Sequence, residues 1–193
     1  MAKQKLNIFA RVRELEGWKA VAYSAALLER MIPNYALFCE VSEYEEAANL
    51  RACLDLIWES VKAPKSKFNV AVQLEKVELG TPDTQDFDTY GVYPAIDAAI
   101  GVAAALNLIG GDDPQGAVVV SKLSQGSVEA YLLASGEASD ETVKEHPLMM
   151  FEIAVQDELL STIEQATSPQ QAAQSLKQVA LEEGISNIGL DLA

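Results

Sequence analysis

The sequence predicts an all-α fold, a compact bundle of about eight short helices that forms one domain over residues 1–193. Three observations lead to this prediction. Apolar residues recur at three- and four-residue spacing, as they do along one face of a helix. Capping residues, prolines and glycines that start or stop helices are frequent. At 193 residues and 49% hydrophobic, the chain can bury a core without a disulfide or a metal.

The first predicted helix has one apolar stripe, formed by Trp18, Val21, Ala25, Leu28 and Ile32. Pro33 is expected to end this helix or to start the next, because proline has no backbone N–H to donate. A short second helix then runs from Pro33 to Val41.

Ser42 to Glu45 fits a capping box, in which the Ser and Glu side chains bond the free N–H groups of a helix start. The stripe behind it consists of Ala47, Leu50, Leu54, Ile57 and Val61. Pro64 ends this helix, and another segment runs from Ser66 to Gly80.

The most apolar segment is Ala95–Gly110, which follows Pro94 and stops at a pair of glycines. A membrane helix needs about 20 apolar residues, and this segment is shorter and contains Asp97 and Asn107. It is predicted to be a buried helix, with no membrane involved.

The remaining segments carry mixed signals. Residues 118–120 are three valines, which favour a strand, but no partner strand is predicted. We therefore expect a helix that is interrupted or bent near Gly126. Ser139 is expected to cap another helix, which Pro147 kinks or restarts. Ser168 is expected to cap the last helix. The tail, 185–193, docks either on its own core or on a neighbour.

The net charge of −15 is unevenly distributed. Residues 1–80 hold eleven bases and eleven acids, whereas residues 81–193 hold three bases and eighteen acids. This balance argues against binding to a phosphate backbone, which needs clustered positive charge. An acidic surface can attract a basic partner or mimic a nucleic acid, although its simplest role is solubility.

Most chemical signatures are absent, so no cofactor and no catalytic residue are predicted. The chain has no phosphate-binding loop and no dinucleotide fingerprint. Its one histidine, His146, excludes a two-histidine zinc site and leaves Cys39 and Cys53 without a nearby base. Both cysteines are interpreted as buried reduced thiols. With no export signal following Met1–Leu6, the cytoplasm is the expected location.

Three polar groupings are candidates for a site. Arg30, in the last turn of its predicted helix, can complement the helix dipole or hold a carboxylate or phosphate. Asp55 and Glu59 lie at i, i+4 and are weak metal candidates. Their neighbours Arg51 and Lys62 favour ordinary ion pairs instead.

The third grouping, residues 87–97, is the most unusual local sequence, with two aspartates and two tyrosines at the start of an apolar helix. Asp97 is surrounded by Ala and Ile and is expected to be partly buried. It therefore needs a partner, such as Arg30 or a tyrosine hydroxyl. A carboxylate with a perturbed pKa on a pocket floor is the functional alternative.

Several strings resemble the YjaG-like family of bacterial proteins, a domain of unknown function. They are Glu29–Cys39, Leu54–Glu59, Gln73–Lys76, Phe87–Ala98, Val120–Lys122 and Ser186–Gly189. They occur in the same order from about residue 12 to residue 189. The resemblance implies an all-helical fold and a bacterial cytoplasmic setting, and it carries over no activity. The matching strings contain all three polar groupings.

Together these observations predict a non-catalytic helical binding protein that associates with an unknown protein partner or with itself. The alternative is a small-molecule or metal-assisted site in one pocket. Its candidate residues are Arg30, Asn34, Tyr35, Asp88, Tyr90, Tyr93 and Asp97. A weaker alternative is an acidic mimic of nucleic acid.

Overall fold

The computed structural model describes residues 7–45 and 47–192. Its α-helices are α1 (Ile8–Arg13), α2 (Trp18–Val41), α3 (Ala47–Lys62), α4 (Val70–Gly80), α5 (Val92–Gly110), α6 (Gly116–Ser135), α7 (Pro147–Gln165) and α8 (Pro169–Leu181). Short 3₁₀ turns lie at Thr84–Asp86 and Val143–Glu145. Strand-like pairing within the described ranges is limited to one bridge between Ile185 and Asp191. The all-α prediction is confirmed. The Met1–Leu6 segment, after which we found no export signal, lies outside the described residues.

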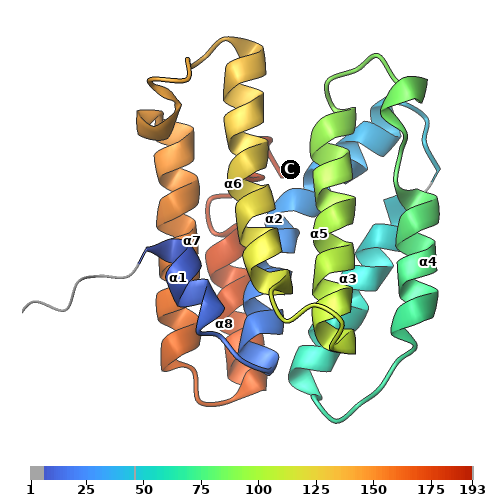
Figure 1. Ribbon diagram of the computed structural model, residues 1–193, viewed down its shortest axis with the longest axis vertical. Coiled ribbons are helices and arrows are strands. Elements are labelled where there is room, and N and C mark those ends of the chain that lie inside the picture. The colour runs from blue at the N-terminus through green and yellow to red at the C-terminus, as the bar shows by residue number, and fades with distance from the viewer. Residues whose placement is uncertain (1–6, 46, 193) are drawn as a thin grey trace, which may run out of the picture.

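Helix α2 is the centre of the bundle and packs against α3, α5, α6, α7 and α8. Figure 1 shows it passing behind α5 and α6, with α7 and α8 on one side and α3 and α4 on the other. Nearly all of its residues from Ala20 to Tyr35 are buried, because neighbours cover it on several faces. A helix that is apolar on all sides suits such a position.

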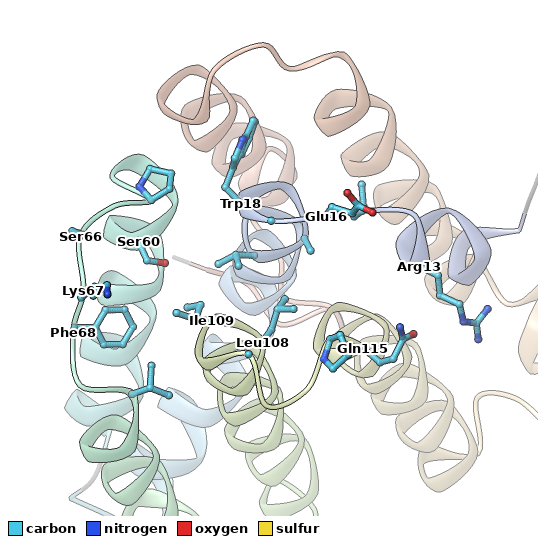
Figure 2. A pocket seen from close by; sticks show the side chains of 18 residues that line it. Arg13, Glu16, Trp18, Ser60, Ser66, Lys67, Phe68, Leu108, Ile109 and Gln115 are labelled. Carbon is cyan, nitrogen blue, oxygen red and sulfur yellow. The ribbon is translucent and has the colours of Figure 1, made fainter.

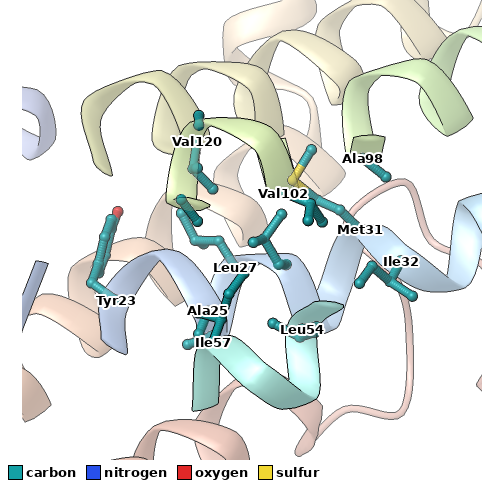
Figure 3. Close-up of a cluster of buried hydrophobic side chains, with 14 of the residues drawn as sticks. Tyr23, Ala25, Leu27, Met31, Ile32, Leu54, Ile57, Ala98, Val102 and Val120 are labelled. Atoms are coloured by element: carbon teal, nitrogen blue, oxygen red, sulfur yellow. The ribbon is translucent and has the colours of Figure 1, made fainter. Parts of the chain in front are cut away.

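The core is built where α2, α3 and α5 meet, with α6 closing it (Figure 3). Leu27, Met31, Leu54 and Val102 are fully buried there. Helix α5 is the one described helix that is long and apolar enough to cross a membrane. More than half of it is buried inside the protein, as expected for a core helix.

The prediction that Pro33 ends a helix was wrong, because α2 continues through it to Val41. Proline removes only its own N–H bond to the carbonyl four residues earlier. On either side of it, Ile32, Asn34 and Tyr35 are buried. Tertiary packing of the whole helix therefore outweighs the local loss.

Two predicted helix starts were also wrong. Ser42 is the C-cap of α2, not the start of a capping box, and the next helix begins at Ala47. Ser139 precedes only a 3₁₀ turn, and α7 begins at Pro147 with His146 as its N-cap. By contrast, Ser168 caps α8 as predicted, and its side chain accepts from the N–H of Gln171.

Helix α6 is uninterrupted from Gly116 to Ser135, so Gly126 does not break it. Its first residue permits close packing against α5. A Cβ on Gly116 would lie 2.5 Å from the carbonyl oxygen of Ala104. At Gly126, by contrast, a Cβ would have no neighbour within 4 Å. The two glycines of one helix thus have different surroundings.

The C-terminal tail docks on its own chain. The backbone N–H of Asn187 donates to the carbonyl of Arg30 at 3.1 Å. Ser186 and Asn187 are fully buried. Of the two positions that the sequence left open for the tail, the structure shows the intramolecular one for its described part.

Candidate functional site

Arg30 forms a buried ion pair with Glu152 of α7, which the sequence did not single out. Nη2 of Arg30 lies 2.9 Å from Oε2 of Glu152, and the two side chains are 1% and 0% exposed. The guanidinium also lies over the Phe151 ring, 5.4 Å from its centre. Arg30 was one of the two partners suggested for Asp97, but it does not pair with Asp97, because its guanidinium pairs with Glu152 inside the bundle.

Glu152 is the hub of a larger set of buried hydrogen bonds. The Ser124 hydroxyl donates to its Oε1 at 2.5 Å, and the Gln156 amide does so at 2.9 Å. We call this set the buried polar network. Its members are Tyr23, Arg30, Asn34, Ser121, Ser124, Glu152, Gln156 and Asn187.

Asn34 and Tyr35, two more predicted site residues, are also engaged inside the protein. Asn34 donates from Nδ2 to Oδ1 of Asn187 at 2.7 Å, which links α2 to the tail. The Tyr35 hydroxyl donates to the carbonyl of Gly80 at 2.6 Å, which links α2 to the end of α4. Both bonds join segments that are distant in sequence, so these two side chains help to hold the fold together.

The weak metal candidates lie on an exposed face of α3. Asp55 accepts from Arg51 at 2.6 Å, and Glu59 from Lys62 at 2.8 Å, which confirms the expected ion pairs. Arg51 also bridges to the buried Glu29, which accepts from the Trp58 indole as well. Among the described residues no group of three or more His, Cys, Asp or Glu could hold a metal ion.

The other predicted residues lead to a groove between α5 and α6, here called the α5–α6 groove. Its volume is about 730 Å³, and it is open to solvent. Its wall is mainly apolar and consists of Thr84, Tyr90, Tyr93, Ile96, Asp97, Val119, Lys122, Leu123, Gly126, Ser127 and Ala130. Three of the seven predicted site residues therefore lie together in it.

Asp97 is the acidic side chain in the wall of this groove. Partial burial raises its pKa above the ordinary 3.8, and the neighbouring Ser127 hydroxyl opposes that effect. No basic side chain within the described ranges forms an ion pair with it. Lys122 lines the same groove, but its Nζ lies over the ring of Phe9 in α1, 5.8 Å from the centre.

Tyr90 and Tyr93 form the aromatic end of the groove. Their ring centres are 5.6 Å apart, and the Tyr131 ring lies 6.2 Å from Tyr90. Desolvation raises the pKa of Tyr90, and the nearby charge of Asp97 adds to this. Tyr93 is 53% exposed, which is high for so large an aromatic side chain. Asp88 is exposed and does not line the groove.

The seven predicted residues therefore do not converge in one pocket. Arg30, Asn34 and Tyr35 bond within the interior, and Tyr90, Tyr93 and Asp97 line the groove. A smaller apolar cavity of about 190 Å³ contacts both sets through Asn34 and Tyr90.

A further cavity of about 800 Å³ lies where the α1–α2, α3–α4 and α5–α6 connections meet. Figure 2 shows Lys67 and Phe68 on one side of it and Glu16 and Arg13 on the other. The charged side chains of Arg13, Glu16 and Lys67 are exposed at the rim of this cavity. None of the seven predicted residues lines it.

The thiols and the histidine have structural positions. Cys39 and Cys53 are buried thiols that form no disulfide, as predicted, and burial raises the pKa of the Cys53 thiol. A raised pKa leaves less of the reactive thiolate at neutral pH. His146 accepts the N–H of Leu148 through Nδ1 at the start of α7.

Sequence reasoning missed Glu152 and Gln156, although a signal was present. Both lie in the helical stripe of Met149, Val155, Leu159 and Ile163, which faces the core. A carboxylate and an amide within an apolar stripe must find partners on burial. Their spacing predicts a buried polar pair, but it cannot identify partners on α2 and α6.

Comparison with known proteins supports the family resemblance. The chain matches the family described as protein of unknown function (DUF416) over residues 7–191. It is 37% identical to the uncharacterized protein YjaG of Escherichia coli over 187 residues, 95% of each chain. It is 34% identical to an uncharacterized protein of Haemophilus influenzae over 189 residues, 95% of this chain and 96% of that one.

The fold is shared with a solved structure. The crystal structure of a DUF416 family protein from Shewanella baltica superposes with a TM-score of 0.89 at 36% identity. The match covers 97% of this chain and 100% of that chain. These similarities extend over nearly the whole length and confirm the resemblance to the YjaG proteins, and the chain therefore belongs to the DUF416 family.

Proposed function

We propose that this protein is a non-catalytic binding protein of the bacterial cytoplasm that holds an apolar segment of a protein partner in the α5–α6 groove. The observation that carries the proposal is the groove itself, an open and mainly apolar surface that three of the predicted site residues line.

The interior offers little support for catalysis. Glu152 is fully buried and accepts from Arg30, Ser124 and Gln156, so its carboxylate is engaged within the fold. A catalytic acid or base has to reach the substrate proton directly or through one water molecule. Three of the predicted site residues, Arg30, Asn34 and Tyr35, likewise form hydrogen bonds within the fold that join its segments.

The shape of the groove suits a segment of polypeptide. Its α6 wall extends from Val119 to Ala130, a length of about 16 Å at 1.5 Å per residue. This equals about three turns of a partner helix, and grooves between helices commonly hold such segments. The exposed Tyr93 at one end is the type of residue that dominates binding energy at interfaces.

Site-specific photo-crosslinking in bacterial cells tests the proposal. A photoreactive phenylalanine analogue replaces the exposed Ala130 in the groove wall, and for comparison the exposed Gln174 on α8. We expect a discrete adduct from position 130 and none from position 174. Adding Gly126→Phe, which fills the groove, should abolish the adduct.

Two results would change this conclusion. Equal adducts from both positions, or an adduct that survives Gly126→Phe, would show that the groove is not the binding surface. An adduct of twice the subunit mass that contains only this chain would show self-association through the groove.

A further inference from the structure

We infer that the segment held in the α5–α6 groove presents a lysine or arginine side chain, whose cation is recognised by Asp97 together with Tyr90 and Tyr93. This inference rests on the proposed function and specifies the chemistry of the partner.

The first argument is the unbalanced charge of Asp97. It is the one acidic side chain among the described residues that line the groove, and the one basic side chain there, Lys122, is directed to Phe9 of α1. A half-buried carboxylate has lost part of its hydration. A cation from outside would restore the lost stabilisation, because opposite charges attract more strongly where water is partly excluded.

The comparison with other shielded acids supports this argument. Glu152 pairs with Arg30, and Glu29 accepts two hydrogen bonds from Arg51. Each of these carboxylates thus has an internal arginine. Asp97 is shielded too, but its cation is missing from the described part of the chain. A ligand can supply it.

The second argument is the aromatic surface beside Asp97. Tyr90 and Tyr93 lie 5.6 Å apart, and the charge of Asp97 acts on the Tyr90 hydroxyl. Aromatic faces attract ammonium and guanidinium groups, and such contacts contribute about 0.5–1 kcal/mol at exposed sites. An acid beside aromatic rings therefore selects a cation attached to an apolar stem.

Overall charge favours the same class of partner. The chain carries a net charge of −15, and residues 81–193, which contain both groove helices, carry all of the excess. A basic segment is attracted to this half before contact. A second copy of the chain carries the same net charge of −15, so a basic partner fits the groove better.

Peptide binding followed by NMR provides the test. The probes are a blocked Leu-Leu-Lys-Leu-Leu peptide and its counterpart with glutamine in place of lysine. They are titrated into the full-length ¹⁵N-labelled protein at low salt, and the amide shifts of Gly126 and Ala130 are followed. We expect the lysine peptide to bind roughly fivefold more tightly, as one cation–π contact with a charge pair would give.

Two variants assign this preference to a residue. Asp97→Asn keeps the size of the side chain and should make the two peptides bind equally. Glu129→Gln removes one charge from an exposed position of α6 outside the groove wall. It should leave the preference intact, which separates a local contact from the general acidity of the chain.

The possible results discriminate among the ideas. Equal binding of both peptides in the groove would overturn the cation inference and leave the proposed function standing. The absence of groove shifts with either peptide would overturn the inference, and the crosslinking result would then decide the proposed function. If the small amine 2-phenylethylammonium shifts the groove resonances and the lysine peptide does not, the cation comes from a small amine, and the inference that a partner segment presents it is overturned.

Discussion

Two carboxylates, Glu152 in the buried polar network and Asp97 in the α5–α6 groove, show how one fold treats acidic groups differently. Glu152 is fully buried and accepts from an arginine, a serine and a glutamine. Asp97 is half-buried, with Ser127 beside it and no cation among the described residues. The first is satisfied internally and stabilises the fold. The second lacks such a pairing, which is why we infer that a ligand supplies its cation.

The largest expected effect comes from breaking the internal pair. Glu152→Leu leaves Arg30 charged and buried without a carboxylate to pair with, and should lower the free energy of unfolding by about 3–5 kcal/mol. Urea unfolding followed by circular dichroism measures the loss. Adding Arg30→Met should recover part of it, because the remaining charge is removed as well. A loss below about 1 kcal/mol would show that water reaches the pair.

The two glycines of α6 extend the comparison from side chains to backbone packing. Gly116→Ala places a methyl group 2.5 Å from the Ala104 carbonyl, so it should destabilise the protein by about 1–3 kcal/mol. Gly126→Ala meets no atom within 4 Å and should stabilise the helix by roughly 0.5–1 kcal/mol. Thermal unfolding of both variants provides the measurement. Equal signs for the two would contradict the different packing of the two positions.

Tyrosines from the interior and the groove give a smaller contrast. Tyr35→Phe removes the donor to the Gly80 carbonyl and should cost about 1 kcal/mol, since that carbonyl is buried. Tyr93→Phe removes a hydroxyl from a half-exposed side chain and should change stability by less than about 0.5 kcal/mol. Chemical denaturation of the pair checks this order, and its reversal would show that Tyr93 is held more firmly than its exposure indicates.

The smallest effect is the pH dependence of Asp97. Burial raises its pKa, so the folded protein keeps this proton to a higher pH than the unfolded chain does. Stability therefore falls as pH rises from about 3.8 through the folded-state pKa, and the loss remains above it. Asp97→Asn does not titrate, so it should be slightly more stable than wild type at pH 7. That advantage should shrink toward pH 4 in unfolding experiments, and an advantage that grows on acidification would mean a lowered pKa.

Much of the fold could be predicted from local patterns. The apolar stripe that includes Leu50 and Leu54 depends on residues close in sequence. So do the caps at Ser168 and Gly111 and the buried character of α5. Errors arose where tertiary packing outweighs a local signal, as at Pro33, or where a polar residue resembles a cap, as at Ser42 and Ser139. At Pro33 the deciding contacts come from distant helices, outside the local window.

The site was predicted only in part for the same reason. Tyr90, Tyr93 and Asp97 lie within eight residues of chain at the start of α5, so their closeness in sequence indicated that they lie together. Nothing in that segment could show that α6 forms the opposite wall. Arg30 was one of two partners suggested for Asp97, the other being a tyrosine hydroxyl. Composition alone could not show that Arg30 pairs with Glu152 instead.

The sequence by itself determined the helical class, the core character of α5 and the acidic second half, because these depend on periodicity, capping and charge along the chain. Only the tertiary structure decided which carboxylate is neutralised internally. Arg30 reaches Glu152 across 122 residues of chain, and Asp97 is left facing the groove. The physical reason is that the pairing of buried charges depends on which helix faces pack together, and that is a property of the whole bundle.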